Sequence, residues 1–306
     1  MDLIKKVGKW IGRLVSILSV IYVAVNLFEM EIDDSIFPDL RILVLAILIF
    51  SFMAMLCNCN NAFVWKRFLS YLTKRELNTR EIICVYLKAN ITKYLPGNVF
   101  QYVGRNVLGK EKGILHKTLI TASVMELVII SISTLFFAIF FSMNHMETIY
   151  EVMIKYANEK IIMMVLFICG IVIIGMLLMN KNVIKKYLSV KNLRCVLEGM
   201  GLYFVSNIIS CVILCGIFHC VLMNTLSFKD IAFANAVSWL AGYVVPGSPG
   251  GIGVRELVFI FLFEGYASRE IVIVAIVLFR LCGIMGDVIS WLFAIGMETY
   301  DKRKVQ

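Results

Sequence analysis

The fold of this chain is decided by one stretch, Val245-Pro246-Gly247-Ser248-Pro249-Gly250-Gly251-Ile252-Gly253-Val254-Arg255-Glu256. The stretch holds two of the chain's four prolines and separates two apolar runs. Proline and glycine interrupt a helix, and a break inside a bilayer survives only where protein or a water-filled cavity satisfies the freed backbone groups. The stretch therefore predicts a broken helix that forms part of a site, with a surface loop between two helices as the alternative.

The composition is that of a membrane protein that crosses the bilayer several times. Of the 306 residues, 60% are hydrophobic and 17% are charged, and the mean hydropathy is +0.86, which leaves too little polar surface for a soluble globule. The net charge of +9 would suggest nucleic acid in a soluble domain, but here the Lys and Arg residues lie in short runs between apolar segments. Such runs set the membrane topology, and no nucleic-acid partner is expected.

Apolar stretches of about 20 residues, the length that crosses a bilayer, predict an all-α polytopic fold in a single integral membrane domain, residues 1–306. About six full spans are expected, near residues 11–28, 40–59, 118–143, 160–179, 196–223 and 270–297. Two further apolar regions, 80–112 and 228–265, are broken by Pro-Gly and are predicted to be re-entrant helical hairpins. The aromatic and basic residues of 61–75 predict a separate helix lying in the membrane interface.

The distribution of positive charge predicts the orientation. Most of the chain's 30 Lys and Arg residues fall on one side if each broken region enters and leaves by the same face. They lie in residues 1–13, 58–80, 88–117, 180–195 and 298–306. Positive loops stay in the cytoplasm, so we expect a protein of the cytoplasmic membrane with both termini inside. The first broken region then enters from the cytoplasm and the second from outside.

The two broken regions share three features in the same order: an acid that opens the apolar stretch, a Pro-Gly pair, and an arginine nine residues after the proline. These are Glu81, Pro96-Gly97 and Arg105 in the first region, and Asp230, Pro246-Gly247 and Arg255 in the second. Because the regions enter from opposite faces, they predict an inverted repeat, as in many secondary transporters; chance similarity of two turns is the alternative. We assign the re-entrant turns to Pro96, Gly97, Pro246, Gly247, Pro249, Gly250, Gly251 and Gly253.

Each broken region is followed by a long helix that carries charge at membrane depth. Glu126 lies in the span after the first, and Arg280 and Asp287 lie in the span after the second. Such a residue costs about 2.5 to 3.5 kcal/mol to insert, so it faces a partner or a cavity. Two roles are open: a set of ion pairs that locks the helices together, or the lining of a polar path.

The chemistry of these residues suits an anion. Arg105, Arg255 and Arg280 stay charged when desolvated and bind phosphate with two hydrogen bonds, and the half-helix that starts near Arg255 directs its positive dipole end toward the break. The acids Glu126, Glu256 and Asp287 would balance the arginines or accept an amine or a proton. We therefore predict these six residues as the lining of a path for an anionic headgroup near the middle of the membrane.

Enzymatic chemistry has little support, so the chain is expected not to be an enzyme. The sequence contains no G-x-S-x-G elbow, no H-E-x-x-H and no P-loop, and its three histidines are scattered. We predict no cofactor and no metal, and we interpret the Cys/His sets as packing residues because no second cluster completes four ligands. These sets are Cys57 with Cys59, and Cys211, Cys215 and Cys220 with His219.

Two motifs carry a resemblance to a known family: Tyr94-Leu95-Pro96-Gly97-Asn98-Val99-Phe100-Gln101-Tyr102-Val103-Gly104-Arg105, and Pro249-Gly250-Gly251-Ile252-Gly253-Val254-Arg255-Glu256. They are similar to motifs of the lysylphosphatidylglycerol synthase transmembrane-region (flippase-like) family, and Glu126 and Arg280 fall where that family places a Glu and an Arg. The chain departs from the family at Gln101 to Gly104, where an acid is frequent, and at Leu127, where a base is common. The resemblance covers nearly the whole chain.

The resemblance implies a stand-alone member that moves a charged phospholipid or glycolipid between leaflets, without the soluble domain that transfers lysine. Its expected partners are membrane lipids and a cell-envelope lipid-modifying or glycosyl transferase. One alternative is a secondary transporter or channel for a small anion, which needs a sealed pathway. Another is a membrane-embedded transferase acting on lipid phosphates or, by family name only, a phosphatidylglycerol aminoacyl transferase.

Overall fold

The structure is a computed structural model, and it describes residues 39–94, 100–142, 190–223, 226–244, 254–263 and 267–305. In these residues the chain is helical and has no β-strand. Four of the described helices are long and apolar enough to cross a membrane: α2 (Leu40–Thr73), α5 (His116–Ser142), α9 (Val190–Gly216), which continues into the π-helical turn η3 (Ile217–Val221), and α12 (Arg269–Val305). The all-α membrane class is confirmed. Expected spans 11–28 and 160–179 lie outside the described residues.

The prediction of a separate interfacial helix at 61–75 is wrong. Helix α2 continues without a break from Leu40 to Thr73 and ends at Lys74, whose positive φ of 54° turns the chain. The aromatic residues of this segment face inward, since Trp65 and Phe68 are fully buried. The last turns of this long helix pack against the bundle, while Lys66 and Arg67 form ion pairs with Glu76, which follows α2, and with Glu198 of α9.

Both broken regions fold as pairs of helices that are packed together and too short to cross a bilayer singly. The first helix pair consists of α3 (Thr79–Asn90), the short helix η2 (Ile91–Tyr94) and α4 (Phe100–Glu111). The second helix pair consists of α10 (Phe228–Val244) and α11 (Val254–Phe263). Local signals start and end these helices: the Asn78 side chain accepts from Arg80 N–H at the start of α3, and Gly113 turns the chain after α4 with φ 74°. The predicted turn residues from Pro96 to Gly97 and from Pro246 to Gly253 lie outside the described residues.

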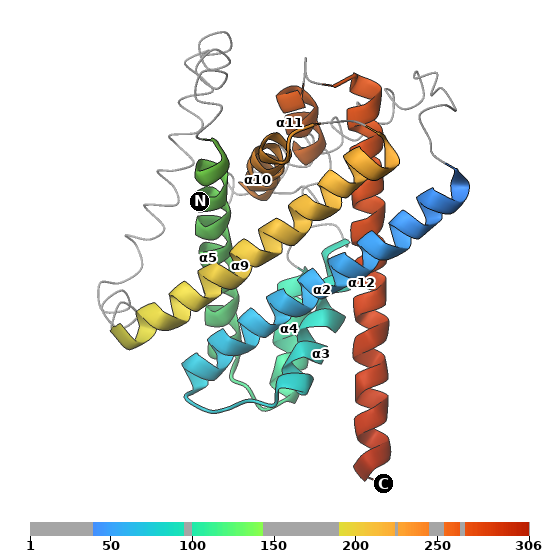
Figure 1. The fold of residues 1–306 in the computed structure, drawn as a ribbon. Helices are drawn as coiled ribbons and strands as arrows, with labels where there is room; N and C mark the ends of the chain where they lie inside the picture. The colour runs from blue at the N-terminus through green and yellow to red at the C-terminus, as the bar shows by residue number, and fades with distance from the viewer. Residues whose placement is uncertain are drawn as a thin grey trace, which may run out of the picture.

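The long helices place the two pairs at opposite ends of the bundle (Figure 1). Helices α2 and α9 run diagonally in opposite directions and pack against each other. Helix α12 extends from the end that holds the second pair to the end that holds the first (Figure 1). Each pair therefore enters the bundle from its own end.

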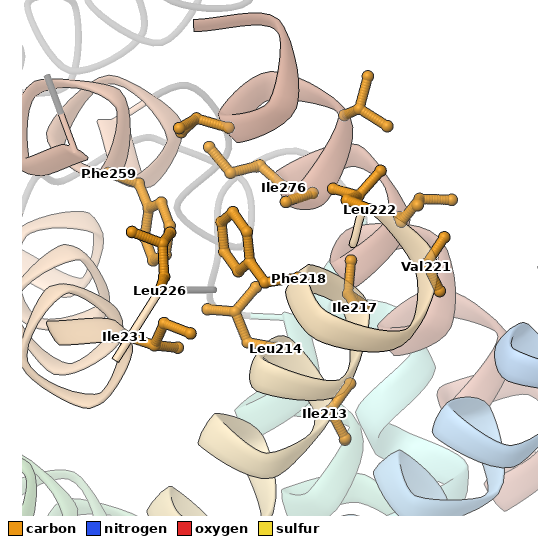
Figure 2. Close-up of a cluster of buried hydrophobic side chains, with 14 of the residues drawn as sticks. Ile213, Leu214, Ile217, Phe218, Val221, Leu222, Leu226, Ile231, Phe259 and Ile276 are labelled. Carbon is orange, nitrogen blue, oxygen red and sulfur yellow. The ribbon is translucent and has the colours of Figure 1, made fainter. Parts of the chain in front are cut away.

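Each helix pair has its own hydrophobic core. The core around the first pair includes Trp65, Phe68, Leu87, Leu119 and Tyr203. The core around the second pair joins the ends of α2 and α9 to α10, α11 and α12, and Figure 2 shows Phe218 directed toward Leu226 and Phe259. The phenyl rings stack further onto Phe263, whose centroid lies 5.7 Å from that of Phe218 and 4.8 Å from that of Phe259.

The contacts of one half of the bundle are repeated in the other half. If α2, α3, α4 and α5 are matched with α9, α10, α11 and α12, then α3 packs on α4 as α10 packs on α11, and α4 packs on α5 as α11 packs on α12. The crossed contacts match as well, because α3 packs on α12 and α10 packs on α5. Each helix pair thus packs against the long helix that belongs to the other half.

Helices α2 and α12 approach closely at Gly286. A Cβ atom added there would lie 2.6 Å from the Ala54 Cβ and 2.9 Å from the Ser51 carbonyl oxygen. Gly283, almost one turn earlier on α12, has open space at the same position. The contact holds α12 against α2 beside the polar residues described below.

We expect Gly286→Ala to destabilise the protein by about 1 to 3 kcal/mol, because an extra methyl group in a packed contact forces the helices apart. Gly283→Ala is the matched control and is expected to be neutral or slightly stabilising, since alanine favours a helix over glycine. Thermal unfolding of both purified variants in the same detergent measures the difference. Equal midpoints for the two variants would contradict the close contact.

Candidate functional site

Asp287, a buried residue of α12, is the centre of a cluster of polar contacts. Its Oδ1 accepts from Asn58 Nδ2 of α2 at 2.9 Å and from Asn90 Nδ2 of α3 at 3.0 Å. Its Oδ2 accepts from the hydroxyl of Tyr94 and forms an ion pair with Lys93 Nζ at 2.7 Å. Three neutral donors and one ammonium group, from three elements, therefore stabilise the ionised carboxylate, and they hold the end of α3 and the helix η2 against α12.

Arg105 and Glu126 form a buried ion pair between α4 and α5. The Tyr86 hydroxyl of α3 donates to Glu126 Oε1 at 2.7 Å, and the same ring lies under the guanidinium, with Arg105 Cζ 3.6 Å from its centroid. Tyr102 and Trp65 lie farther out, at 5.4 and 5.7 Å. The buried guanidinium of Arg105 is therefore stabilised by one carboxylate and by the faces of aromatic rings, which replace the water that it loses on burial.

The second helix pair also forms an ion pair with a long helix, but here the acid is on the short helix and the arginine is on the long one. Arg280 Nε of α12 donates to Glu256 Oε1 of α11 at 2.6 Å. In the first half the arginine is on the short helix and the acid on the long one, and in the second half the positions are exchanged. The neighbouring Arg255 lies over the Trp239 ring, with its Cζ 5.5 Å from the centroid, and its side chain fills the space beside Gly242.

The three groups are linked into one series of polar residues. Tyr86 and Asn90 are four residues apart on α3 and so share a face, which joins the Glu126 contacts to those of Asp287. Arg280 and Asp287 are seven residues apart on α12 and so share a face, which places the pair of Arg280 with Glu256 on the same side of α12 as Asp287. The series therefore runs from the first helix pair to the second through the interior of the bundle.

All six predicted path residues are described, and they fall into this series. Glu126 meets Arg105, and Glu256 meets Arg280, as opposite charges at membrane depth should. The series also contains residues that the sequence analysis did not single out, namely Asn58, Tyr86, Asn90, Lys93, Tyr94, Trp65, Tyr102 and Trp239. The signal for Asn58 was present in the sequence: it opens a run with Asn60 and Asn61 inside an apolar helix, where amides are costly unless they are bonded.

The other two amides of that run join α2 to α9. Asn60 Nδ2 donates to the Leu202 carbonyl at 2.7 Å and to Ser206 Oγ at 2.8 Å, and Ser206 Oγ donates to Asn61 Oδ1 at 2.7 Å. Bonds of this kind between helices satisfy polar groups that lipid cannot satisfy. They hold the crossing of α2 and α9, while Asn58 alone faces Asp287.

In the residues described, no three His, Cys, Asp or Glu side chains gather as metal ligands do. His219, which the sequence groups with Cys215 and Cys220, forms a local contact between its Nδ1 and the Cys215 carbonyl at 2.9 Å.

No model of a known protein family matches the sequence, and a search of curated proteins found no match. The family resemblance of the two Pro-Gly motifs therefore stays a prediction.

Proposed function

We propose that this protein is a lipid translocase that moves a charged headgroup between the leaflets of the cell membrane along the series of polar residues. The observation that carries the proposal is the series of polar side chains that runs from Arg105 and Glu126 to Asp287 and, along the same face of α12, to Arg280 and Glu256. Hydrocarbon excludes a charged headgroup, so its passage needs polar partners at every depth. The acyl chains stay in lipid beside the bundle.

The matched contacts of the two halves support the inverted repeat expected from the sequence. In this proposal the helix pairs are re-entrant hairpins, each of which forms a gate on its own side of the membrane. Because each pair leans on the long helix of the other half, movement of one pair is transmitted to the other. The first pair lies at the end where α12 finishes (Figure 1), which the positive-inside rule assigns to the cytoplasm.

The resemblance to the flippase-like family agrees with this function but does not carry it. The six path residues would act by binding and orientation, since each charge already has a partner of opposite sign or an aromatic face. The entering headgroup replaces these partners in turn. The pairs thus serve as gates that close again when the headgroup has passed.

The test is transport of fluorescent phospholipids in proteoliposomes. We expect Arg255→Ala and Glu256→Gln to slow lipid movement by about tenfold or more, the effect of losing one charged hydrogen bond. Arg269→Ala is the control, because it removes an exposed arginine at the start of α12. Folded variants that move every lipid as fast as the wild type would contradict the site. Wild-type protein that moves no lipid and carries chloride or phosphate across sealed vesicles would instead be an anion transporter.

A further inference from the structure

The arginine of each helix pair lies over an aromatic ring of the helix that precedes it. In the first pair, Arg105 of α4 lies over Tyr86 of α3, with its Cζ 3.6 Å from the ring centroid. In the second pair, Arg255 of α11 lies over Trp239 of α10, at 5.5 Å. The two arginines differ in burial, because Arg105 is 2% exposed and Arg255 is half-buried. Of the two, Arg255 is therefore the one that an entering molecule reaches more easily.

Gly242 completes the contact between Arg255 and α10. It follows Trp239 by three residues, so the two share a face of the helix. A Cβ atom added at Gly242 would lie 2.4 Å from Cγ of Arg255, 2.8 Å from its Nε and 3.1 Å from its Cδ. The stem of the arginine thus lies against bare backbone at Gly242, while its guanidinium lies over the Trp239 ring. We call these two residues, Trp239 and Gly242, the α10 slot.

The slot has a cost and a use. Glycine is less favourable than alanine inside a helix, so α10 gives up helix stability at Gly242 and gains room for the arginine stem. Stacking on a ring covers the face of a guanidinium and leaves its N–H groups directed outward from its edge. A side chain that is ordered before a ligand arrives binds that ligand more tightly, because its conformational entropy is already lost.

We propose that Trp239 and Gly242 are positioning residues, which hold the guanidinium of Arg255 in the orientation that receives the anionic part of the headgroup. The inference rests on the proposed function in taking Arg255 as a headgroup ligand. It goes further in assigning the orientation of Arg255 to α10. The two helices of the second pair then act together, because a separation of α10 from α11 would release the arginine from the slot.

The slot is tested first by a double-mutant cycle on thermal unfolding in detergent. Gly242→Ala is expected to lower the unfolding midpoint by about 3 °C or more, because the added methyl group displaces Arg255 or parts α10 from α11. In an Arg255→Ala background the same substitution should leave the midpoint unchanged or raise it, since the stem is gone and alanine favours a helix. An equal decrease in both backgrounds would contradict the slot.

Gly201→Ala is the matched control, because Gly201 lies on α9 with open space at its Cβ position. It is expected to leave the midpoint unchanged or to raise it. If Gly242→Ala alone yields no folded protein, the slot requires that Arg255→Ala restores folding in the double variant, and failure to restore it would contradict the slot.

The positioning role is tested by lipid movement in proteoliposomes. Gly242→Ala is expected to slow it as much as Arg255→Ala does, by about tenfold, and the double variant should be no slower than either single variant. Trp239→Phe keeps an aromatic face and should move lipid about threefold faster than Trp239→Leu, which has no ring. Packing alone does not separate these two variants when their unfolding midpoints agree. Wild-type rates for Gly242→Ala, or equal rates for the two Trp239 variants, would contradict the positioning role.

The outcomes also separate this inference from the proposed function. If Arg255→Ala moves lipid as fast as the wild type, the proposed site fails and the slot has no role in transport, although the unfolding cycle still decides whether the slot exists. If Arg255→Ala slows lipid movement while the Gly242 and Trp239 variants do not, only the positioning role is contradicted.

Discussion

Asp287→Asn is expected to destabilise the protein by about 3 to 5 kcal/mol and to stop lipid movement, because it leaves Lys93 without its buried counter-charge. The amide keeps one oxygen for Asn58 and Asn90, but its nitrogen then faces the Tyr94 hydroxyl and the Lys93 ammonium. The end of the first helix pair would lose its attachment to α12. Thermal unfolding in detergent and transport in proteoliposomes measure the two effects.

Glu298→Gln is the control for this prediction. Glu298 lies on the same helix and pairs with Lys88 of α3, but the Lys88 side chain is 26% exposed and the Glu298 side chain 33%. Ion pairs that are this exposed contribute about 0 to 1 kcal/mol to stability. We expect a small shift of the unfolding midpoint and normal transport. If Asp287→Asn behaves like Glu298→Gln, then the four contacts of Asp287 do not hold the first pair.

Glu126→Gln is expected to have an effect of similar size, about 3 to 5 kcal/mol, since it leaves the Arg105 guanidinium buried among aromatic rings with no carboxylate. The Tyr86 hydroxyl can still donate to the amide oxygen, but the amide nitrogen cannot accept the bond that Arg105 donates to Glu126 Oε2, so the charge and that hydrogen bond are lost together. Circular dichroism melting of the purified variant measures it.

The double variant Arg105→Met/Glu126→Gln separates a paired charge from a packing effect. Removal of both charges from a buried pair is far less costly than removal of one, so the double variant should recover much of the stability that Glu126→Gln loses. The coupling between the two positions, obtained from the double-mutant cycle, should exceed about 1 kcal/mol. Additive effects would contradict the buried pair. Transport by the double variant should remain low, because the path has lost its first two charges.

Local signals in the sequence were sufficient to predict where the helices lie in the chain, but not how the helices pack against one another. The Pro-Gly pairs correctly divided the regions around α3 with α4 and α10 with α11, since a helix break is a property of the backbone at that point. The interfacial helix at 61–75 was wrong because its aromatic residues fit a membrane interface and a protein interior equally well. Only packing distinguishes the two, and Trp65 and Phe68 pack against the first pair.

The candidate site shows the same division. Glu126, Arg280 and Asp287 were identified because a charge inside an apolar run is visible in the sequence and costly in lipid. Arg105, Arg255 and Glu256 were identified because they follow the Pro-Gly pairs. Their partners were not, since Lys93 and Tyr94 follow α3 in a mixed segment where polar residues carry no such cost signal. Asp287 meets them across 193 or more positions of sequence.

The sequence by itself determined the membrane class, the four described long helices and the positions of the buried charges, because hydrophobicity, helix breaks and the cost of charge in lipid are local properties. The tertiary structure alone decided that Arg105 pairs with Glu126 and Arg280 with Glu256, that each helix pair packs against the long helix of the opposite half, and that Lys93 pairs with Asp287. These are contacts between segments far apart in the chain. They depend on how the helices cross, and the crossing is set by close approaches such as Gly286 on Ala54, which no local pattern reveals.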